Sequence, residues 1–187
     1  MEVLNFGSIK CVVLPDDWSA DSEQNTGLLK MRCFHPPAHE DVEVAFFQKT
    51  QGVPETAMQE FREILGRGPH KIVEGGEELL QLAPVMGNAG NHQWSNKNRG
   101  ARGPNFRYTL GEITQLQGRA VLKVKGSFIE PQSKKPQNEY CGIFIDSGAE
   151  NNVIQEVYLQ VPSKYGYFQF ERYVNAFSDA LSTIVWT

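Results

Sequence analysis

The chain has 187 residues, a formal net charge of −4 and 40% hydrophobic residues. This length suits one substantial domain, and the composition is ordinary for a globular protein. Because the balance of charge is mildly acidic, we do not expect nucleic acid or an anionic membrane as a partner unless a local basic patch supplies the attraction.

The N-terminal stretch has no long apolar core, so we expect neither a signal peptide nor a membrane-inserted helix. The cysteines Cys11, Cys33 and Cys141 are widely spaced, and each lies in a strand-like run. An odd number of cysteines without a secretion signal predicts buried, reduced thiols in a cytoplasmic protein.

The first predicted strand covers Ile9–Leu14 and ends at Pro15, since proline removes a ladder donor. We expect Ile9, Cys11 and Val13 to share one side of it, and Trp18 to anchor the edge of the core. The strands Leu28–Phe34 and Val42–Lys49 follow. A hairpin loop with two adjacent prolines, residues 35–41, joins these two strands.

Pro54–Leu65 is predicted to be a helix, with Pro54 in its first turn and Gly66 at its C-terminal end. Its apolar stripe is Met58, Phe61 and Leu65. The segment Glu77–Leu82 fits either a short helix or a strand, and we expect Pro84 to end whichever forms. A long Gly/Asn-rich basic loop is predicted for residues 87–104.

Four antiparallel strands follow this loop. In residues 120–128 apolar and polar side chains alternate, which is typical of a sheet with one buried face. Gln117-Gly118 predicts a tight turn, and Gly111 predicts a bulge. The four predicted strands are Phe106–Leu116, Ala120–Ile129, Tyr140–Ile145 and Val153–Val161.

An amphipathic helix, Phe168–Ile184, is predicted to close the chain and cover the sheet, with Trp186 packing back onto it. No internal repeat or linker-like change in composition interrupts the pattern. We therefore predict a single α+β domain, residues 1–187, with a central antiparallel β-sheet of about six to eight strands flanked by helices.

This order of elements resembles the PsbP-like α/β sandwich superfamily. The resemblance is carried by the strand exit Leu14-Pro15-x-x-Trp18 and by the final helix ending in Ile184-Val185-Trp186. The superfamily includes the photosystem extrinsic protein, Mog-type Ran-binding import factors and bacterial Eag-type secretion chaperones. The resemblance implies an α/β/α sandwich and a non-enzymatic protein, bacterial in the nearest analogy, that binds another protein and needs no cofactor. It transfers no individual site residue.

A basic stretch within residues 87–107 carries one indole and several cations but no acid. Arginine, lysine and an aromatic ring are the groups that contact phosphates and stack on bases. A solvated loop is the simpler interpretation, and phosphate or nucleic-acid binding is the alternative. The candidate binding residues are Trp94, Lys97, Arg99, Arg102 and Arg107.

Asp146-Ser147-Gly148 follows an apolar strand, as in retroviral-type aspartic proteases. That chemistry needs two aspartates sharing one proton, and a homodimer could supply the second one. However, the 38 residues left after Ala149 offer little room for the rest of a protease fold. We interpret the segment as a hairpin turn and keep an aspartic-protease-like enzyme as an alternative.

His35 and His39 lie close to Cys33, Glu40 and Asp41, all of them residue types that bind zinc. No second ligand pair recurs, and two prolines separate the histidines, so we expect a solvated loop and no metal site. No nucleophile elbow is present. The sequence therefore predicts a non-catalytic protein-binding module, adaptor or chaperone-like, without catalytic residues.

Overall fold

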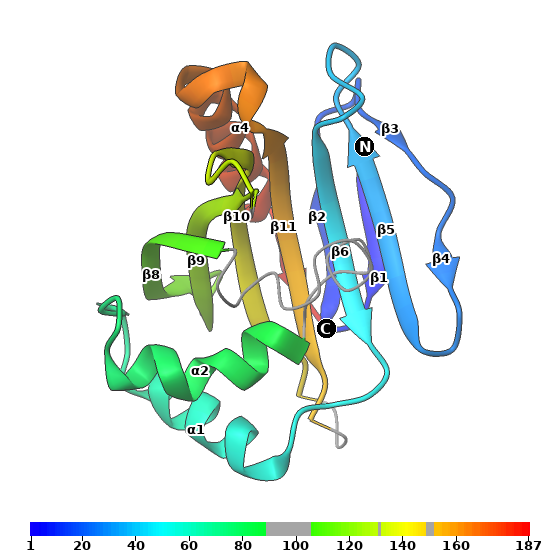
Figure 1. Cartoon of the computed structure of the whole chain (residues 1–187). Coiled ribbons are helices and arrows are strands. Elements are labelled where there is room, and N and C mark those ends of the chain that lie inside the picture. Colours follow the sequence, from blue (N-terminus) through cyan, green and yellow to red (C-terminus); the bar gives the residue numbers. More distant parts are fainter. Residues whose placement is uncertain (89–105, 131, 149–151) are drawn as a thin grey trace.

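The computed structural model describes residues 1–88, 106–130, 132–148 and 152–187. Within these residues, an antiparallel sheet of nine strands forms the centre of the molecule (Figure 1). Its order is β3-β5-β6-β11-β10-β9-β8-β7, and β4 also pairs with β5. The strands of this sheet are β3 (Ser19–Ala20), β4 (Gln24–Asn25), β5 (Leu29–His35), β6 (Glu43–Lys49), β7 (His70–Lys71), β8 (Phe106–Leu116), β9 (Arg119–Ile129), β10 (Pro136–Asp146) and β11 (Ile154–Pro162).

A second sheet has the order β1-β2-β12. The remaining elements are β1 (Glu2–Phe6), β2 (Ile9–Val13), α1 (Glu55–Gly66), α2 (Glu77–Asn88), the 3₁₀ turn η1 (Ser163–Tyr165), α4 (Gly166–Leu181) and β12 (Val185–Trp186). The predicted α+β class with a mostly antiparallel sheet is thus confirmed. The strand count exceeds the prediction because β3, β4 and β7 are two-residue edge strands.

The meander from β8 to β11 follows from the alternation in the sequence. The turn residues Gln117 and Gly118 both have positive φ, 48° and 79°, which matches the two-residue turn of a tight hairpin. The bulge in β8 lies between Tyr108 and Leu110, so it comes just before Gly111. The strand β10 begins at Pro136, earlier than expected, because it continues the pairing with β9 down to Ile129.

Helices α1 and α2 cover one face of the central sheet. The buried side of α1 includes Met58, Phe61 and Ile64, which pack on strand residues such as Phe144. The expectation that Pro84 ends its element was wrong, because α2 continues through it to Asn88.

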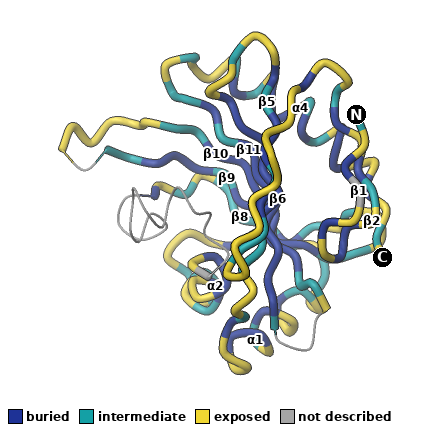
Figure 2. The backbone as a smooth tube through the Cα atoms, turned by 90° about the vertical axis from the view of Figure 1, so that its right-hand side faces the viewer, coloured by how far each residue is buried: buried dark blue, intermediate teal, exposed yellow. Residues whose placement is uncertain are grey.

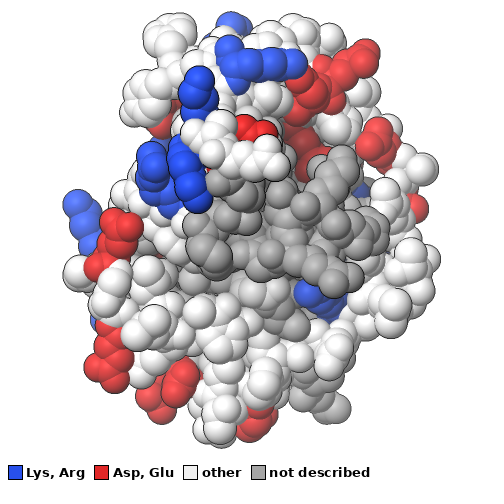
Figure 3. All heavy atoms as spheres, viewed as in Figure 1, with Lys and Arg blue, Asp and Glu red and all other residues white. Residues whose placement is uncertain are grey.

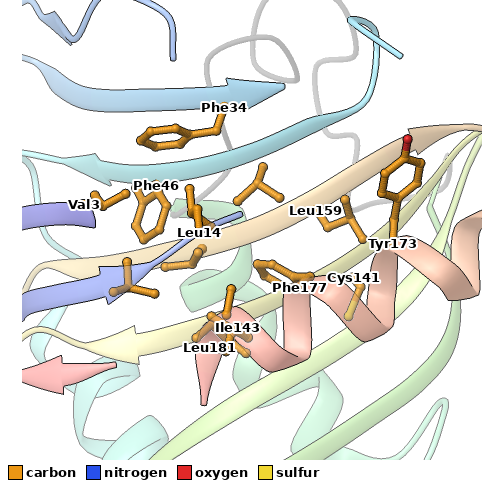
Figure 4. Close-up of a cluster of buried hydrophobic side chains, with 14 of the residues drawn as sticks. Val3, Leu14, Phe34, Phe46, Cys141, Ile143, Leu159, Tyr173, Phe177 and Leu181 are labelled. Atoms are coloured by element: carbon orange, nitrogen blue, oxygen red, sulfur yellow. The ribbon is translucent and has the colours of Figure 1, made fainter. Parts of the chain in front are cut away.

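The opposite face is shared by α4 and the three-stranded sheet. In Figure 4, Phe177 and Leu181 of α4 point toward Ile143 of β10. The expected anchors Trp18 and Trp186 pack on this same core, and the Trp186 indole donates to the Leu116 carbonyl oxygen at 3.1 Å. Figure 2 shows buried residues along the inner strands and exposed residues in the surrounding loops and hairpin tips.

Two N-terminal features differ from the prediction. The strand β1 was not predicted, and in β2 it is Ile9 and Val12 that are buried, whereas Val13 is 42% exposed. Cys11 is only half-buried, whereas Cys33 and Cys141 are buried as predicted, and all three thiols are free. Among the described residues, no helix has the length and hydropathy needed to cross a membrane.

Candidate functional site

Of the five binding residues proposed from the sequence, one lies within the described residues. Trp94, Lys97, Arg99 and Arg102 lie outside the described residues. Arg107 is the second residue of β8, and its side chain is exposed. On the face shown in Figure 3, the described charges are mixed in sign, with cations toward the upper left and acids toward the lower left and upper right.

Asp146 ends β10 and is held by two contacts. Its Oδ2 accepts a hydrogen bond from Arg62 Nε of α1 at 2.8 Å, and its Oδ1 accepts one from the Gly148 backbone N–H at 2.9 Å. The hydrogen bond to Asp146 raises the pKa of Arg62. These contacts tie α1 to the β10–β11 hairpin, a role that fits the interpretation of this segment as a turn.

The two histidines of the β5–β6 loop make separate structural contacts. His35 Nδ1 lies 2.9 Å from the Val42 carbonyl oxygen, and its Nε2 lies 3.2 Å from Asp21 Oδ2. His39 instead reaches α4, where its Nδ1 lies 2.7 Å from the Tyr173 hydroxyl. Within the described ranges, no cluster of three or more His, Cys, Asp or Glu side chains could hold a metal ion.

A long groove runs along α4, and we call it the α4 groove. Its first hollow, of about 270 Å³, lies between α4 and the loops that follow β2 and β5. The loop wall consists of residues 17–18 and 36–39, and the helix wall of Gln169, Arg172, Tyr173 and Ala176. This hollow brings Trp18, the prolines of the β5–β6 loop and Tyr173 together from three distant parts of the chain.

The second hollow of the α4 groove has a volume of about 400 Å³. It is lined by residues 13–16 on one side and by Ala176, Asp179, Ala180 and Thr183 on the other. Ala176 lines both hollows, so they follow one another along the helix. Because α4 ends at Leu181, the helical span of residues 169–181 extends for about 18 Å beside these hollows, at 1.5 Å per residue.

Side-chain contacts hold the β5–β6 loop, which forms part of the loop wall of the α4 groove. The His39 ring lies against the Tyr165 ring with centroids 4.2 Å apart, in addition to its contact with the Tyr173 hydroxyl. Asp41 accepts a hydrogen bond from the Tyr165 hydroxyl at 2.6 Å and pairs with Lys164 at 2.5 Å. The β5–β6 loop is therefore attached to the beginning of α4 by both rings and charges.

Two aromatic side chains at the start of α4 are exposed. Tyr167 is 76% exposed and Phe168 is 85% exposed, both in the first turn of α4. Because residues four apart are neighbours on a helix, Phe168 lies one turn before Arg172 on the row that borders the α4 groove. Arg172 is exposed, and no described residue forms an ion pair with it.

The opposite face of the sheet contains two buried acid–phenol pairs. The Tyr140 hydroxyl donates to Glu156 at 2.7 Å, and the Tyr158 hydroxyl donates to Glu43 at 2.5 Å. Burial raises the pKa of Tyr158 well above its ordinary value, and the nearby charge of Glu43 raises it further. Burial also raises the pKa of Cys33, so this thiol is kept protonated and unreactive.

Sequence reasoning found only part of the α4 groove. It identified Trp18 as a core anchor and Tyr173 as a core residue, and both are buried, but it did not predict that they border a hollow. The available signal was the adjacent pair Tyr167-Phe168 at the start of the amphipathic helix, because two large aromatic side chains there cannot both face the core.

Comparison with known proteins supplies no direct guide to this site. No family model matches the chain, and a search of curated proteins finds no significant match. The function of the α4 groove is therefore argued from its own shape and chemistry.

Proposed function

We propose that this protein is a non-catalytic protein-binding module, adaptor or chaperone-like, with a PsbP-like α/β/α sandwich fold. Helices on both faces of the antiparallel sheet support the sandwich arrangement. The three free thiols are consistent with our proposal that the protein acts in the reducing cytoplasm. The partner binds in the α4 groove.

The observation that carries this proposal is the exposure of Phe168 beside a groove with fixed walls. Single exposed apolar residues are normal on protein surfaces. Here, however, Phe168 lies one helical turn before Arg172, which lines the hollow together with Trp18 and Tyr173. Aromatic residues and arginine are enriched in the centres of protein interfaces and supply most of their hot spots. The groove brings both kinds together at one end of α4.

A blocking substitution tests the proposal. Ala176 lines both hollows, so Ala176→Arg fills the α4 groove without removing a core side chain. We expect immobilised wild-type protein to retain one stoichiometric partner from an extract of the native host, and Ala176→Arg and Phe168→Ser each to weaken it at least about tenfold. Quantitative mass spectrometry measures the retained partner.

Leu28→Ser is the matched control. Leu28 is 76% exposed, as Tyr167 is, but it lies between β4 and β5 and lines neither hollow. Its substitution should leave partner binding unchanged, and thermal unfolding should show that all variants fold. A partner that binds wild type and Ala176→Arg equally well would show that the α4 groove is not the binding site.

A further inference from the structure

The outer side of α2 carries an apolar stripe in addition to its buried side. A helix that covers a sheet usually has a polar outer side. In α2, however, Leu80 is 71% exposed, and the other outward positions of the stripe are occupied by small or apolar residues. They recur at intervals of three, four and seven residues, so they lie on one side of the helix. The stripe consists of the exposed residues Leu80, Ala83, Pro84 and Gly87.

A hollow of about 210 Å³ adjoins this stripe, between α2 and β8. Its walls include Leu79 of α2 and Leu110 of β8, and both side chains are only half-buried. Val73, in the loop before α2, is 71% exposed beside the hollow. An apolar cavity of about 150 Å³ is large enough for benzene, so this hollow can accommodate one large apolar side chain of a partner. We call the stripe and the hollow together the α2 surface.

The charges around the α2 surface are mainly negative. Residues 55–88 contain six glutamates but only three lysine or arginine residues. Two of these cations are already used, because Arg62 pairs with Asp146 and Arg67 pairs with Glu78. The third, Lys71, borders the hollow. The glutamates of this segment that form no ion pair with any described residue include Glu60, Glu63, Glu74 and Glu77.

Figure 3 shows the same arrangement on the surface, where the region over α2 is uncharged and acids lie to its left and below it. Such a border repels nucleic acids and anionic membranes and is complementary to Lys or Arg on a protein. Large exposed aliphatic side chains beside an open hollow are typical of a protein interaction site. The α2 surface therefore favours a basic protein partner.

The shape of the α2 surface favours a partner helix. The backbone groups of a helix are bonded within it, so α2 offers no free sheet edge that an extended strand could join. Two helices instead pack with the ridge of one in the groove of the other, and Ala83 and Gly87 permit a close approach. Pro84 has no N–H group, so the Leu80 carbonyl oxygen lacks its usual donor and can accept a hydrogen bond from the partner.

We propose that the α2 surface binds an amphipathic helix of a partner protein in which Lys or Arg residues flank an apolar stripe. One large apolar side chain of that helix enters the hollow beside Leu79, and its basic side chains face Glu74 and Glu77. The α2 surface lies on the opposite face of the sheet from the α4 groove, so this inference goes beyond the proposed function. With both surfaces occupied, the protein bridges two partners.

Photocrosslinking identifies what contacts the α2 surface. The photoreactive amino acid p-benzoylphenylalanine replaces Ala83, and the full chain is illuminated in an extract of the native host. We expect one crosslinked partner, and mass spectrometry should place the crosslink in a segment with apolar residues at helical spacing and flanking Lys or Arg. The same amino acid in place of Leu28, an exposed residue outside the α2 surface, should not give this product.

Substitutions then measure the contacts with a synthetic peptide of the crosslinked segment. We expect the peptide to become helical on binding, by circular dichroism, and Leu80→Ser to weaken it at least about tenfold in fluorescence anisotropy. Leu28→Ser removes a similarly exposed leucine and should change nothing. The double variant Glu74→Gln with Glu77→Gln should bind severalfold more weakly and with less dependence on salt. Thermal unfolding should show that every variant folds.

Several results would overturn this inference. They are the absence of a crosslink at position 83, a crosslink to a second copy of this chain, a bound peptide that does not become helical, and equal binding by Leu80→Ser and wild type. Ala176→Arg should leave the peptide bound, because that residue lines only the α4 groove. If Ala176→Arg still releases its own partner while the α2 surface binds nothing, the proposed function stands and this inference is wrong.

Discussion

Replacement of Tyr173 by phenylalanine tests whether the β5–β6 loop is anchored to α4. The substitution removes the hydroxyl that lies 2.7 Å from His39 Nδ1 and keeps the buried ring. A hydrogen bond of this kind contributes a net ~0.5–1.5 kcal/mol to the free energy of unfolding. We therefore expect Tyr173→Phe to lose about 1 kcal/mol, which for a chain of this size lowers Tm by roughly 2–4 °C.

A double-mutant cycle separates this bond from other effects. His39→Ala also removes the ring contact with Tyr165, so alone it should cost more than Tyr173→Phe. Because both single variants lose the same bond, the double variant should fall short of the sum by about 1 kcal/mol in urea unfolding followed by circular dichroism. Tyr167→Phe, at a ring 76% exposed, should stay within about 0.5 kcal/mol of wild type. Losses that add to within about 0.3 kcal/mol would refute the anchoring contact.

Two further predictions concern the core. Burial raises the pKa of Cys141 from its ordinary value of 9.0 to about 11, so the unfolded chain releases this proton first and stability falls between pH 9 and 11. The loss should be about 2–3 kcal/mol smaller in Cys141→Val than in wild type, in urea unfolding at pH 8 and 11 with a reductant; equal losses would contradict the linkage. A Cβ on Gly126 would overlap the Arg107 carbonyl oxygen, so Gly126→Ala should cost about 1–3 kcal/mol. Gly66→Ala, with nothing within 4 Å, should gain about 0.5–1 kcal/mol, and equal stability of the two variants would contradict the close approach.

The four-stranded meander could be predicted from the sequence because alternate residues of its strands face different surroundings on the two sides of the sheet. In β9, Leu122 and Val124 belong to the core under α1 and α2, whereas Val121 belongs to the core under α4. Between them, Lys123 pairs with Glu112 of the neighbouring β8, and Lys125 pairs with Glu171 of α4. Such a strict alternation determines the register, and the sequence alone shows it.

The strand β1 could not be predicted from alternation. Its buried residues Val3 and Phe6 are three apart, and Asn5 between them has a φ of 53°. That left-handed residue turns the chain, so the period of two is lost within five residues. The strand forms because β2 pairs with it across the Gly7-Ser8 turn, where Gly7 has a φ of 58°.

Pro84 shows tertiary packing overriding local propensity. A proline inside a helix costs roughly 3 kcal/mol, since it removes one hydrogen bond and crowds the preceding turn. On either side of it, Leu82, Val85 and Met86 are almost fully buried in the core. Each buried side chain of that size contributes about 1.5–3 kcal/mol, so the three together exceed the cost of the proline. The proline side chain itself is exposed, so α2 continues without losing core contacts.

The α4 groove could not be predicted from sequence patterns. Trp18, His39 and Tyr173 come from separate elements, and His39 and Tyr173 are 134 positions apart. Each residue has an adequate local explanation, as an anchor, a loop residue or a core residue. Only the packing of α4 beside the end of β2 places the three around one hollow.

The position of the α4 groove follows from how one face of the central sheet is covered. That face carries a helix next to a small sheet, and a cylinder beside a flat layer leaves a furrow where the two meet. Phe177 and Leu181 on the inward side of α4 hold the helix on the sheet, whereas Arg172, Ala176 and Asp179 along the furrow lie outside that core. Residues 15–18 and 36–39 border the furrow but belong to neither helix nor strand core. We expect substitutions at the exposed positions Asp17, Pro37 and Ala38 to change partner binding at little cost to stability, whereas Trp18 and His39 also hold the core and the β5–β6 loop.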